Sequence, residues 1–120
     1  MQRELLNTVR HDAAPREQVL EAARAWEAGL REKFPEIMRV GCFGSYARDT
    51  YAPGSDLDIL IEVTATPHAR RADRAARYLP DTFPVPIELF VYTTDELRRL
   101  RREGSAFIGA VDRDVCWIGS

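Results

Sequence analysis

Cysteine and long apolar runs are both scarce in this chain. The two cysteines, Cys42 and Cys116, are too few for a disulfide framework and favour a reducing compartment, which we expect to be the cytoplasm. Glu62 interrupts the apolar run that starts at 59, so the sequence offers no membrane-spanning segment. The first ten residues lack the apolar centre of a signal peptide, and we therefore do not expect export.

A surplus of basic charge is absent as well. The 120 residues carry a formal net charge of −2, and the sequence pI is about 5.7. General nucleic-acid binders usually show a basic surplus, so we do not expect nucleic acid to be a partner. The chain is too short for two sizeable cores, and 45% of it is hydrophobic. We therefore expect a single domain over residues 1–120 that folds without disulfides or a structural metal.

Short apolar segments alternate with amphipathic ones along the chain. Pro15 suits the first turn of a helix whose apolar stripe includes Val19 and Leu30. Thr93 and Glu96 have the spacing of a helix capping box. The predicted elements are helices at 15–34, 45–51, 67–79 and 93–103, and strands at 37–43, 57–63, 85–92 and 113–118. This alternation predicts a sheet covered by helices, and the segment before 15 is left unassigned.

Asp56 and Asp58 stand at the start of the strand at 57–63. Residues two apart in a strand share a face, so these two carboxylates should point the same way and repel each other. A divalent cation such as Mg²⁺, which prefers oxygen ligands, would remove that conflict. The simpler alternative is that the two aspartates form only a solvated rim.

Glu88 lies inside the apolar segment "PIELFVY". A charge among apolar strand residues costs free energy unless it is paired or bound to a metal. If this strand lies beside the strand of Asp56 and Asp58, Glu88 completes a three-carboxylate cluster that could hold two metal ions. The alternative is that Glu88 pairs with an arginine at a sheet edge.

Gly44 and Ser45 lie between a predicted strand and a predicted helix, where free backbone N–H groups favour an anion. Gly44 would let the backbone approach a phosphate closely, and the Ser45 hydroxyl could donate a further hydrogen bond. Arg48, one helical turn later, could add a charge-assisted contact. A Gly-Ser pair alone carries little information.

The combination is more specific. Gly44-Ser45, the string "GSYARDTYAPGSDLDILIEV" that contains Asp56 and Asp58, and Glu88 in a later strand resemble the minimal nucleotidyltransferase family of the DNA polymerase β-like superfamily. The resemblance implies an α+β fold, a small mixed β-sheet with helices packed mainly on one face. It also places the strand at 57–63 between the strand at 37–43 and the strand of Glu88.

The resemblance also implies roles for these residues. Family members transfer a nucleotidyl group from a nucleoside triphosphate to a hydroxyl, with Mg²⁺. Asp56 and Asp58 would bind two Mg²⁺ ions, for which Mn²⁺ could substitute, and Glu88 would bind the catalytic ion and help deprotonate the acceptor. The triphosphate of ATP would be held by Gly44 and Ser45. Arg48 would make a further phosphate contact.

The short chain leaves about thirty residues after Glu88, too few for a separate acceptor-binding domain. Small members of the family resemble antitoxins that add AMP to a tyrosine of a HEPN-domain ribonuclease toxin, and we expect such a protein partner. Two alternatives stay open. The protein could act by contact alone, without catalysis, or it could be a homodimeric transferase for small molecules of the aminoglycoside type. The intact carboxylates favour catalysis over contact, and the short chain disfavours the small-molecule enzyme.

Several other features are given structural interpretations. The arginines of 98–102 are expected to be a solvated helix face, with partner or RNA contact as the alternative. Trp26 and Cys42 are expected in the core. His11 and His68 have no neighbouring ligand pattern, and we assign neither to a metal.

Overall fold

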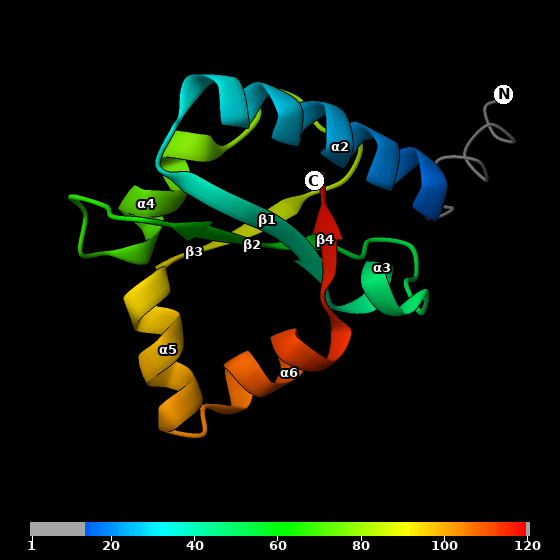
Figure 1. Cartoon of the computed structure of the whole chain (residues 1–120). Helices are drawn as coiled ribbons and strands as arrows, with labels where there is room; N and C mark the ends of the chain where they lie inside the picture. The colour runs from blue at the N-terminus through cyan, green and yellow to red at the C-terminus, as the bar shows by residue number, and fades with distance from the viewer. Residues whose placement is uncertain (1–13, 120) are drawn as a thin grey trace, which may run out of the picture.

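The computed structural model describes residues 14–119, which form a four-stranded mixed sheet with helices on both sides (Figure 1). In chain order the elements are α2 (Arg16–Lys33), β1 (Ile37–Phe43), α3 (Ser45–Arg48), β2 (Leu57–Val63), α4 (Arg71–Tyr78), β3 (Ile87–Thr93), α5 (Thr94–Arg102), α6 (Ala106–Asp114) and β4 (Cys116–Ile118). The strand order is β3-β2-β1-β4. Within this range no helix is long and apolar enough to cross a membrane.

The strand β2 lies between β1 and β3, as the sequence predicted. It runs antiparallel to β1 and parallel to β3, while β4 pairs antiparallel with the other side of β1. The carboxyl end of β1 therefore meets the amino ends of β2 and β3 at one end of the sheet. The predicted α+β class with a small mixed sheet is confirmed.

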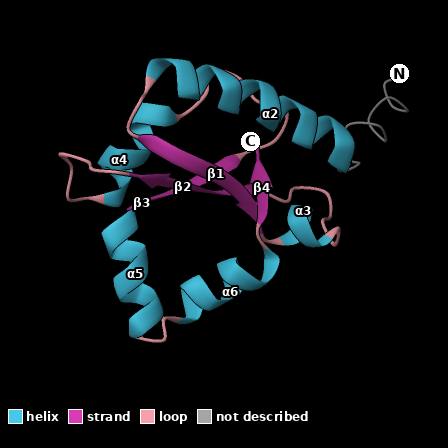
Figure 2. Ribbon diagram, viewed as in Figure 1, coloured by secondary structure: helices cyan, strands magenta, loops and turns pink. Residues whose placement is uncertain are grey.

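The alternation of β2 divides the core into two layers. Leu57, Ile59, Ile61 and Val63 face the larger core cluster, to which α2 contributes Val19, Ala23 and Leu30 and α4 contributes Tyr78. Leu60 faces a smaller cluster on the opposite side, beneath α5 and α6. Figure 2 shows α2 on one side of the sheet and α5 and α6 on the other. Most of the buried apolar side chains thus lie on the α2 side.

Two predicted helices have different bounds in the structure. The helix expected from 67 begins at Arg71, because the Thr66 hydroxyl accepts a hydrogen bond from the His68 N–H and the Arg74 side chain binds the His68 carbonyl. These contacts hold 67–70 in a loop. The helix expected over 45–51 ends at Arg48, since Asp49 adopts the left-handed conformation with a φ of 63°.

The helix α6 was not predicted, and the last strand begins at Cys116 rather than at 113. Ser105 caps α6 by accepting a hydrogen bond from the Ile108 N–H. Ile108 and Val111 are its buried residues, three apart, as expected for an amphipathic helix. Gly109 lowers the helix propensity in the middle of this segment, which obscures the pattern.

Other expectations are confirmed. Cys42 is fully buried, and Trp26 is partly buried against the larger core. The arginines at 98, 99, 101 and 102 are exposed on α5. His68 is exposed, whereas His11 lies outside the described residues. Thr93 and Glu96 form the predicted capping box at the start of α5.

Arg74 is a buried arginine that the sequence did not reveal. Its guanidinium donates to both carboxylate oxygens of Glu96, at 2.8 and 3.0 Å, and to the Val91 carbonyl of β3 at 3.0 Å. The Arg74 side chain is 9% exposed and that of Glu96 is 26% exposed. Glu96 therefore links α4 and the edge strand β3 to the start of α5.

We expect Glu96→Gln to lower the free energy of unfolding by about 1–2 kcal/mol, because a nearly buried guanidinium would lose its countercharge. Urea denaturation at pH 7 would measure the change as a lower midpoint. Glu103→Gln is the matched control, since Glu103 and its partner Arg99 are both more than half exposed and 3.9 Å apart. Equal midpoints for the two variants would contradict this account of α4 and α5.

Candidate active site

Strand register brings Asp58 and Glu88 together at one end of the sheet. Asp58 on β2 is paired with Phe43 on β1 and with Glu88 on β3. Residues opposite each other on neighbouring strands share a face, so the Asp58 and Glu88 carboxylates lie side by side. Both point to the side of the sheet opposite the larger core, which Leu57 and Leu89 face. Asp56 precedes β2 by one residue and is exposed.

The charges at this end of the sheet are mutually unfavourable. Burial, together with the nearby carboxylates of Glu88 and Asp56, raises the pKa of Asp58 to about 6, whereas Arg48 acts in the opposite direction. Both neighbours are therefore close enough to destabilise the ionised form of Asp58. In the structure this repulsion exceeds the help from Arg48.

The carboxylates interact without meeting at one point. Among residues 14–119 no three Asp, Glu, His or Cys side chains are arranged so that they could hold a metal ion. The donor chemistry nevertheless fits a hard cation, because the carboxylates of Glu88 and Asp56 both act unfavourably on the Asp58 carboxylate and Arg48 compensates for this only in part. Metal binding by Asp56, Asp58 and Glu88 stays a prediction.

The sequence argument for Glu88 was wrong in one respect. Glu88 is exposed to solvent, and β3 is an edge strand, so its charge is not buried among apolar residues. What singles Glu88 out is its register with Asp58. A strand pattern alone does not reveal which strand lies beside which, and for that reason the burial argument misled.

The backbone at Gly44 lies directly against the side chain of Asp58. Its φ of +79° belongs to the left-handed region, and a Cβ placed on it would collide with Oδ2 of Asp58. Only glycine therefore allows the backbone to pass over the carboxylate at this point. Ser45 follows as the first residue of the single-turn helix α3, so the backbone of the Gly-Ser pair lies beside Asp58.

The start of α2 holds this loop in place. Arg16 donates from Nε to the Tyr46 carbonyl at 2.7 Å, and its backbone N–H donates to the Tyr51 hydroxyl at 3.0 Å. The Tyr46 and Tyr51 rings are stacked with centroids 4.3 Å apart. Tyr46 is buried and packs into the larger core, so its ring is not available to a nucleotide base.

Sequence reasoning missed Arg16, although one signal was present. The first turn of a helix favours acidic residues, because the helix dipole is positive there. A basic residue at the first position of α2 is locally unfavourable and indicates a tertiary contact. That contact is the carbonyl groups of Tyr46 and Ala47 at the end of α3.

Arg48 is bound to Asp114 at the end of α6. Its Nη1 lies 2.9 Å from Oδ2 of Asp114, and hydrogen bonds from Arg48 and Arg113 help to lower the pKa of Asp114. Arg48 is also close enough to act on Asp58. The ion pair between Arg48 and Asp114 thus connects α6 to the candidate site. No local sequence motif predicts this contact.

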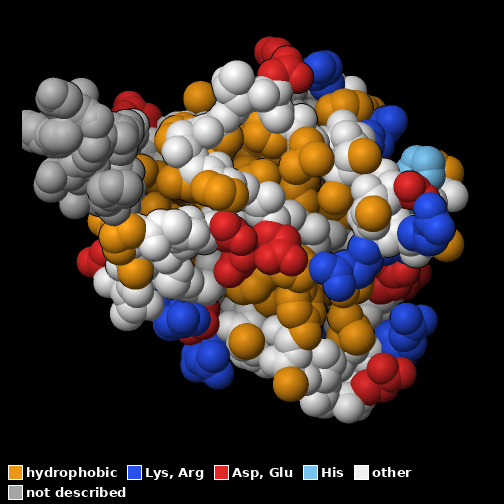
Figure 3. All heavy atoms as spheres, turned by 180° about the vertical axis from the view of Figure 1, so that it is seen from behind, with side chains coloured by type: hydrophobic (Ala, Val, Ile, Leu, Met, Phe, Trp, Pro, Cys, Tyr) orange, Lys and Arg blue, Asp and Glu red, His pale blue; other side chains and the backbone are white. Residues whose placement is uncertain are grey.

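Aromatic side chains lie next to the carboxylates. Phe43, the register partner of Asp58, has its ring centroid 5.4 Å from Phe90 and 5.8 Å from Phe107 of α6. The Arg71 guanidinium lies 4.8 Å from the Phe90 centroid. Figure 3, seen from behind, shows acidic side chains grouped near the centre of the face with hydrophobic surface on both sides.

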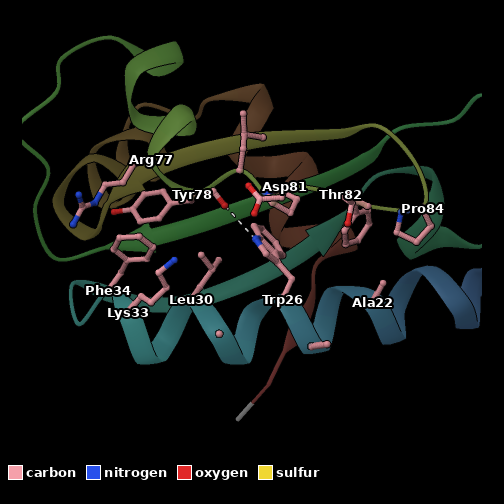
Figure 4. A pocket seen from close by; sticks show the side chains of 15 residues that line it. Ala22, Trp26, Leu30, Lys33, Phe34, Arg77, Tyr78, Asp81, Thr82 and Pro84 are labelled. Atoms are coloured by element: carbon pink, nitrogen blue, oxygen red, sulfur yellow. Dashed lines mark hydrogen bonds between the residues drawn. The ribbon is translucent and has the colours of Figure 1, made fainter.

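A cavity of about 770 Å³ lies elsewhere, between α2 and the segment at 77–84 (Figure 4). Its lining includes Trp26, whose indole N–H donates to the Tyr78 carbonyl at 3.1 Å, and Phe83, which packs edge-on against Trp26. None of the six predicted site residues lines it. This cavity and the carboxylates are therefore separate features.

Comparisons with known proteins identify the family of this chain. A family model described as a nucleotidyltransferase domain matches residues 24–110. The chain is 34% identical over 62 residues to a protein of Methanocaldococcus jannaschii named "Putative protein adenylyltransferase". That match covers 52% of this chain and 62% of the relative's length.

A solved structure agrees at the level of the fold. A crystal structure of a putative nucleotidyltransferase from Sulfolobus solfataricus superimposes with a TM-score of 0.59 at 22% identity, covering 85% of this chain and 80% of that one. The family match includes the Gly44 loop, the two aspartates and Glu88. This chain belongs to the nucleotidyltransferase domain family.

Proposed function

We propose that this protein is an enzyme that transfers AMP from ATP to a hydroxyl group, most simply a tyrosine, of a partner protein in a Mg²⁺-dependent reaction. The observation that carries the proposal is the crowding of three carboxylates beside a glycine loop, with Asp58 at the centre. The name of the M. jannaschii relative, which refers to protein adenylylation, supports a protein acceptor.

Asp56, Asp58 and Glu88 would hold the metal. When bound, two Mg²⁺ ions would stabilise the attacking and leaving oxygens of a phosphoryl displacement. The Asp58 carboxylate is suited to this role because its ionised form is destabilised until a cation approaches. Glu88, exposed at the sheet edge, is accessible to an acceptor and could take the proton from its hydroxyl.

The remaining residues would bind the triphosphate. Gly44 leaves the backbone free of a side chain at the carboxylate, and Ser45 adds a hydroxyl at the next position. Arg48 is held by Asp114, and its side chain is still 47% exposed, so its guanidinium retains surface for a phosphate oxygen. The loop would therefore supply hydrogen-bond donors beside the carboxylates.

The acceptor would come from a second protein, of which a HEPN-type toxin ribonuclease is our first choice. This would make the enzyme an antitoxin that acts on its partner in the cytoplasm. Within residues 14–119, α6 packs on the sheet and β4 is one of its strands, so both belong to the same unit as the candidate site. The hydrophobic surface beside the acidic group is compatible with a protein partner (Figure 3).

We expect Asp58→Asn to stabilise the metal-free protein at pH 7 by about 1–2 kcal/mol, less than the full pKa shift implies because the site is partly exposed. The pKa of about 6 lies above the ordinary value of 3.8, so the folded protein binds this proton more tightly than the unfolded chain does. The penalty is therefore complete above pH 6 and disappears as the pH falls toward 4.

Urea denaturation across this pH range in EDTA would measure the effect, and added Mg²⁺ should stabilise the wild type more than the variant. Asp81→Asn, in an exposed loop, is the control and should follow the wild type at every pH. If Asp58→Asn and wild type are equally stable at pH 7, the carboxylates are not in conflict, and the observation that carries the proposal is lost.

We expect Asp56→Asn together with Asp58→Asn to reduce AMP transfer at least about 1,000-fold, since losing metal-held charge should cost about 4 kcal/mol or more in the transition state. The measurement is incubation with labelled ATP, Mg²⁺ and a HEPN-type partner, followed by mass spectrometry for AMP on a partner tyrosine. Asp73→Asn with Asp95→Asn removes the same charge from exposed helix positions and should leave transfer unchanged.

The same experiment separates the alternatives. If neither wild type nor the double variant labels the partner, yet both silence it, the protein acts by contact and the proposed transfer is wrong. Labelling of a small aminoglycoside instead of a protein, with sedimentation as a homodimer, would overturn the choice of acceptor while keeping the chemistry.

A further inference from the structure

The two cysteines of the chain are direct neighbours across the sheet. Cys42 of β1 is paired in register with Cys116 of β4, and the strands are antiparallel. Residues opposite each other in such a pair point to the same face. The neighbouring pair, Val40 and Ile118, confirms the alignment, because both are buried in the larger core.

The two thiols differ in their surroundings. Cys42 is fully buried, whereas Cys116 is exposed on the edge strand, and both are free thiols. Burial first, and then the proximity of Cys116, raises the pKa of Cys42 to about 12. In the reduced protein Cys42 is thus a neutral core residue, and Cys116 is close enough to influence it.

We propose that Cys42 and Cys116 form a reversible cross-strand disulfide when the folded protein meets a small-molecule disulfide. Opposite residues in an antiparallel pair have Cα atoms about 4.5–5.5 Å apart, inside the roughly 4.4–6.8 Å that disulfides span. The strand β4 is short and lies at the sheet edge, so a small adjustment there disturbs no strand beyond it.

The exchange proceeds in two steps. The exposed Cys116 thiolate attacks one sulfur of the small disulfide, which releases one thiolate and leaves a mixed disulfide on Cys116. The Cys42 thiolate, after losing its proton to solvent, attacks the Cys116 sulfur and expels the second thiolate. The protein loses two hydrogens in total, and the small disulfide is reduced to two thiols.

The bond would join parts of the chain that build the candidate site. Cys42 lies two residues before Gly44, and Cys116 lies two residues after Asp114, the partner of Arg48. The closed loop would contain Asp58 and Glu88. In a reducing compartment the thiols stay apart, so the bond would form only under oxidation.

The test uses the full chain. After treatment with glutathione disulfide under native conditions, we expect the intact mass to fall by about 2 Da as two alkylatable thiols are lost. The melting temperature should rise by roughly 5–10 °C, and dithiothreitol should reverse both changes. Cys42→Ser should instead retain one glutathione on Cys116.

The matched control moves the exposed thiol by one residue. Trp117 pairs with Gly41 and faces the other side of the sheet, so Cys116→Ser with Trp117→Cys keeps two cysteines but directs one away from Cys42. This variant should form no internal bond. If wild type stops at the Cys116–glutathione adduct, or links only between molecules through Cys116, the proposal is wrong.

Discussion

The register of β2 between β1 and β3 is the constraint on which the rest of the structure depends. Leu57, Ile59 and the later odd-numbered residues of β2 are committed to the larger core, so Asp58 must face the other side. A slip of one residue would exchange the faces and bury the carboxylate under α2. Hydrophobic burial of one face therefore fixes the position of a charge on the other, and the pairing with β3 then places Glu88 beside it.

The negative charge of Asp58 destabilises the folded protein, and the neighbouring Arg48 offsets this effect only in part. Arg48 moderates Asp58, but its guanidinium is shared with Asp114, and the balance still leaves the pKa of Asp58 raised. A fold selected for stability alone would place a neutral side chain there. The same argument applies to Gly44, because its left-handed φ disfavours any other residue and a side chain there would also collide with the Asp58 carboxylate. Both features are consistent with the Mg²⁺ and triphosphate that we propose as the ligands of this site.

The strands and helix that carry the motif could be predicted from the sequence, because the residues that determine their bounds lie within or next to each element. The bounds of β1 and β2 follow from apolar patterns closed by Gly44 and preceded by a turn, and the Thr93 capping box marks the start of α5. The contacts of Arg16, Arg74 and Asp114 could not be predicted in this way. The contacts of Arg16 with Tyr46, of Arg74 with Val91 and of Arg48 with Asp114 each join residues 17 or more apart in the chain, and no sequence period or spacing encodes them. The exposure of Glu88 could not be predicted from local sequence either, because it depends on β3 being an edge strand.

The C-terminal part of the chain completes the candidate site although it contains none of the motif. The family match ends at 110, and Asp114 lies beyond it, yet Asp114 binds Arg48, which lowers the pKa of Asp58. Both ends of α6 are held next to the candidate site. Phe107 near its start packs against Phe43, and β4, which follows its end, pairs with β1. Because β1 leads directly into Gly44, we expect a displacement of β4 or α6 to affect the loop that would hold the triphosphate. The position of that loop is therefore a property of the whole sheet rather than of the motif alone.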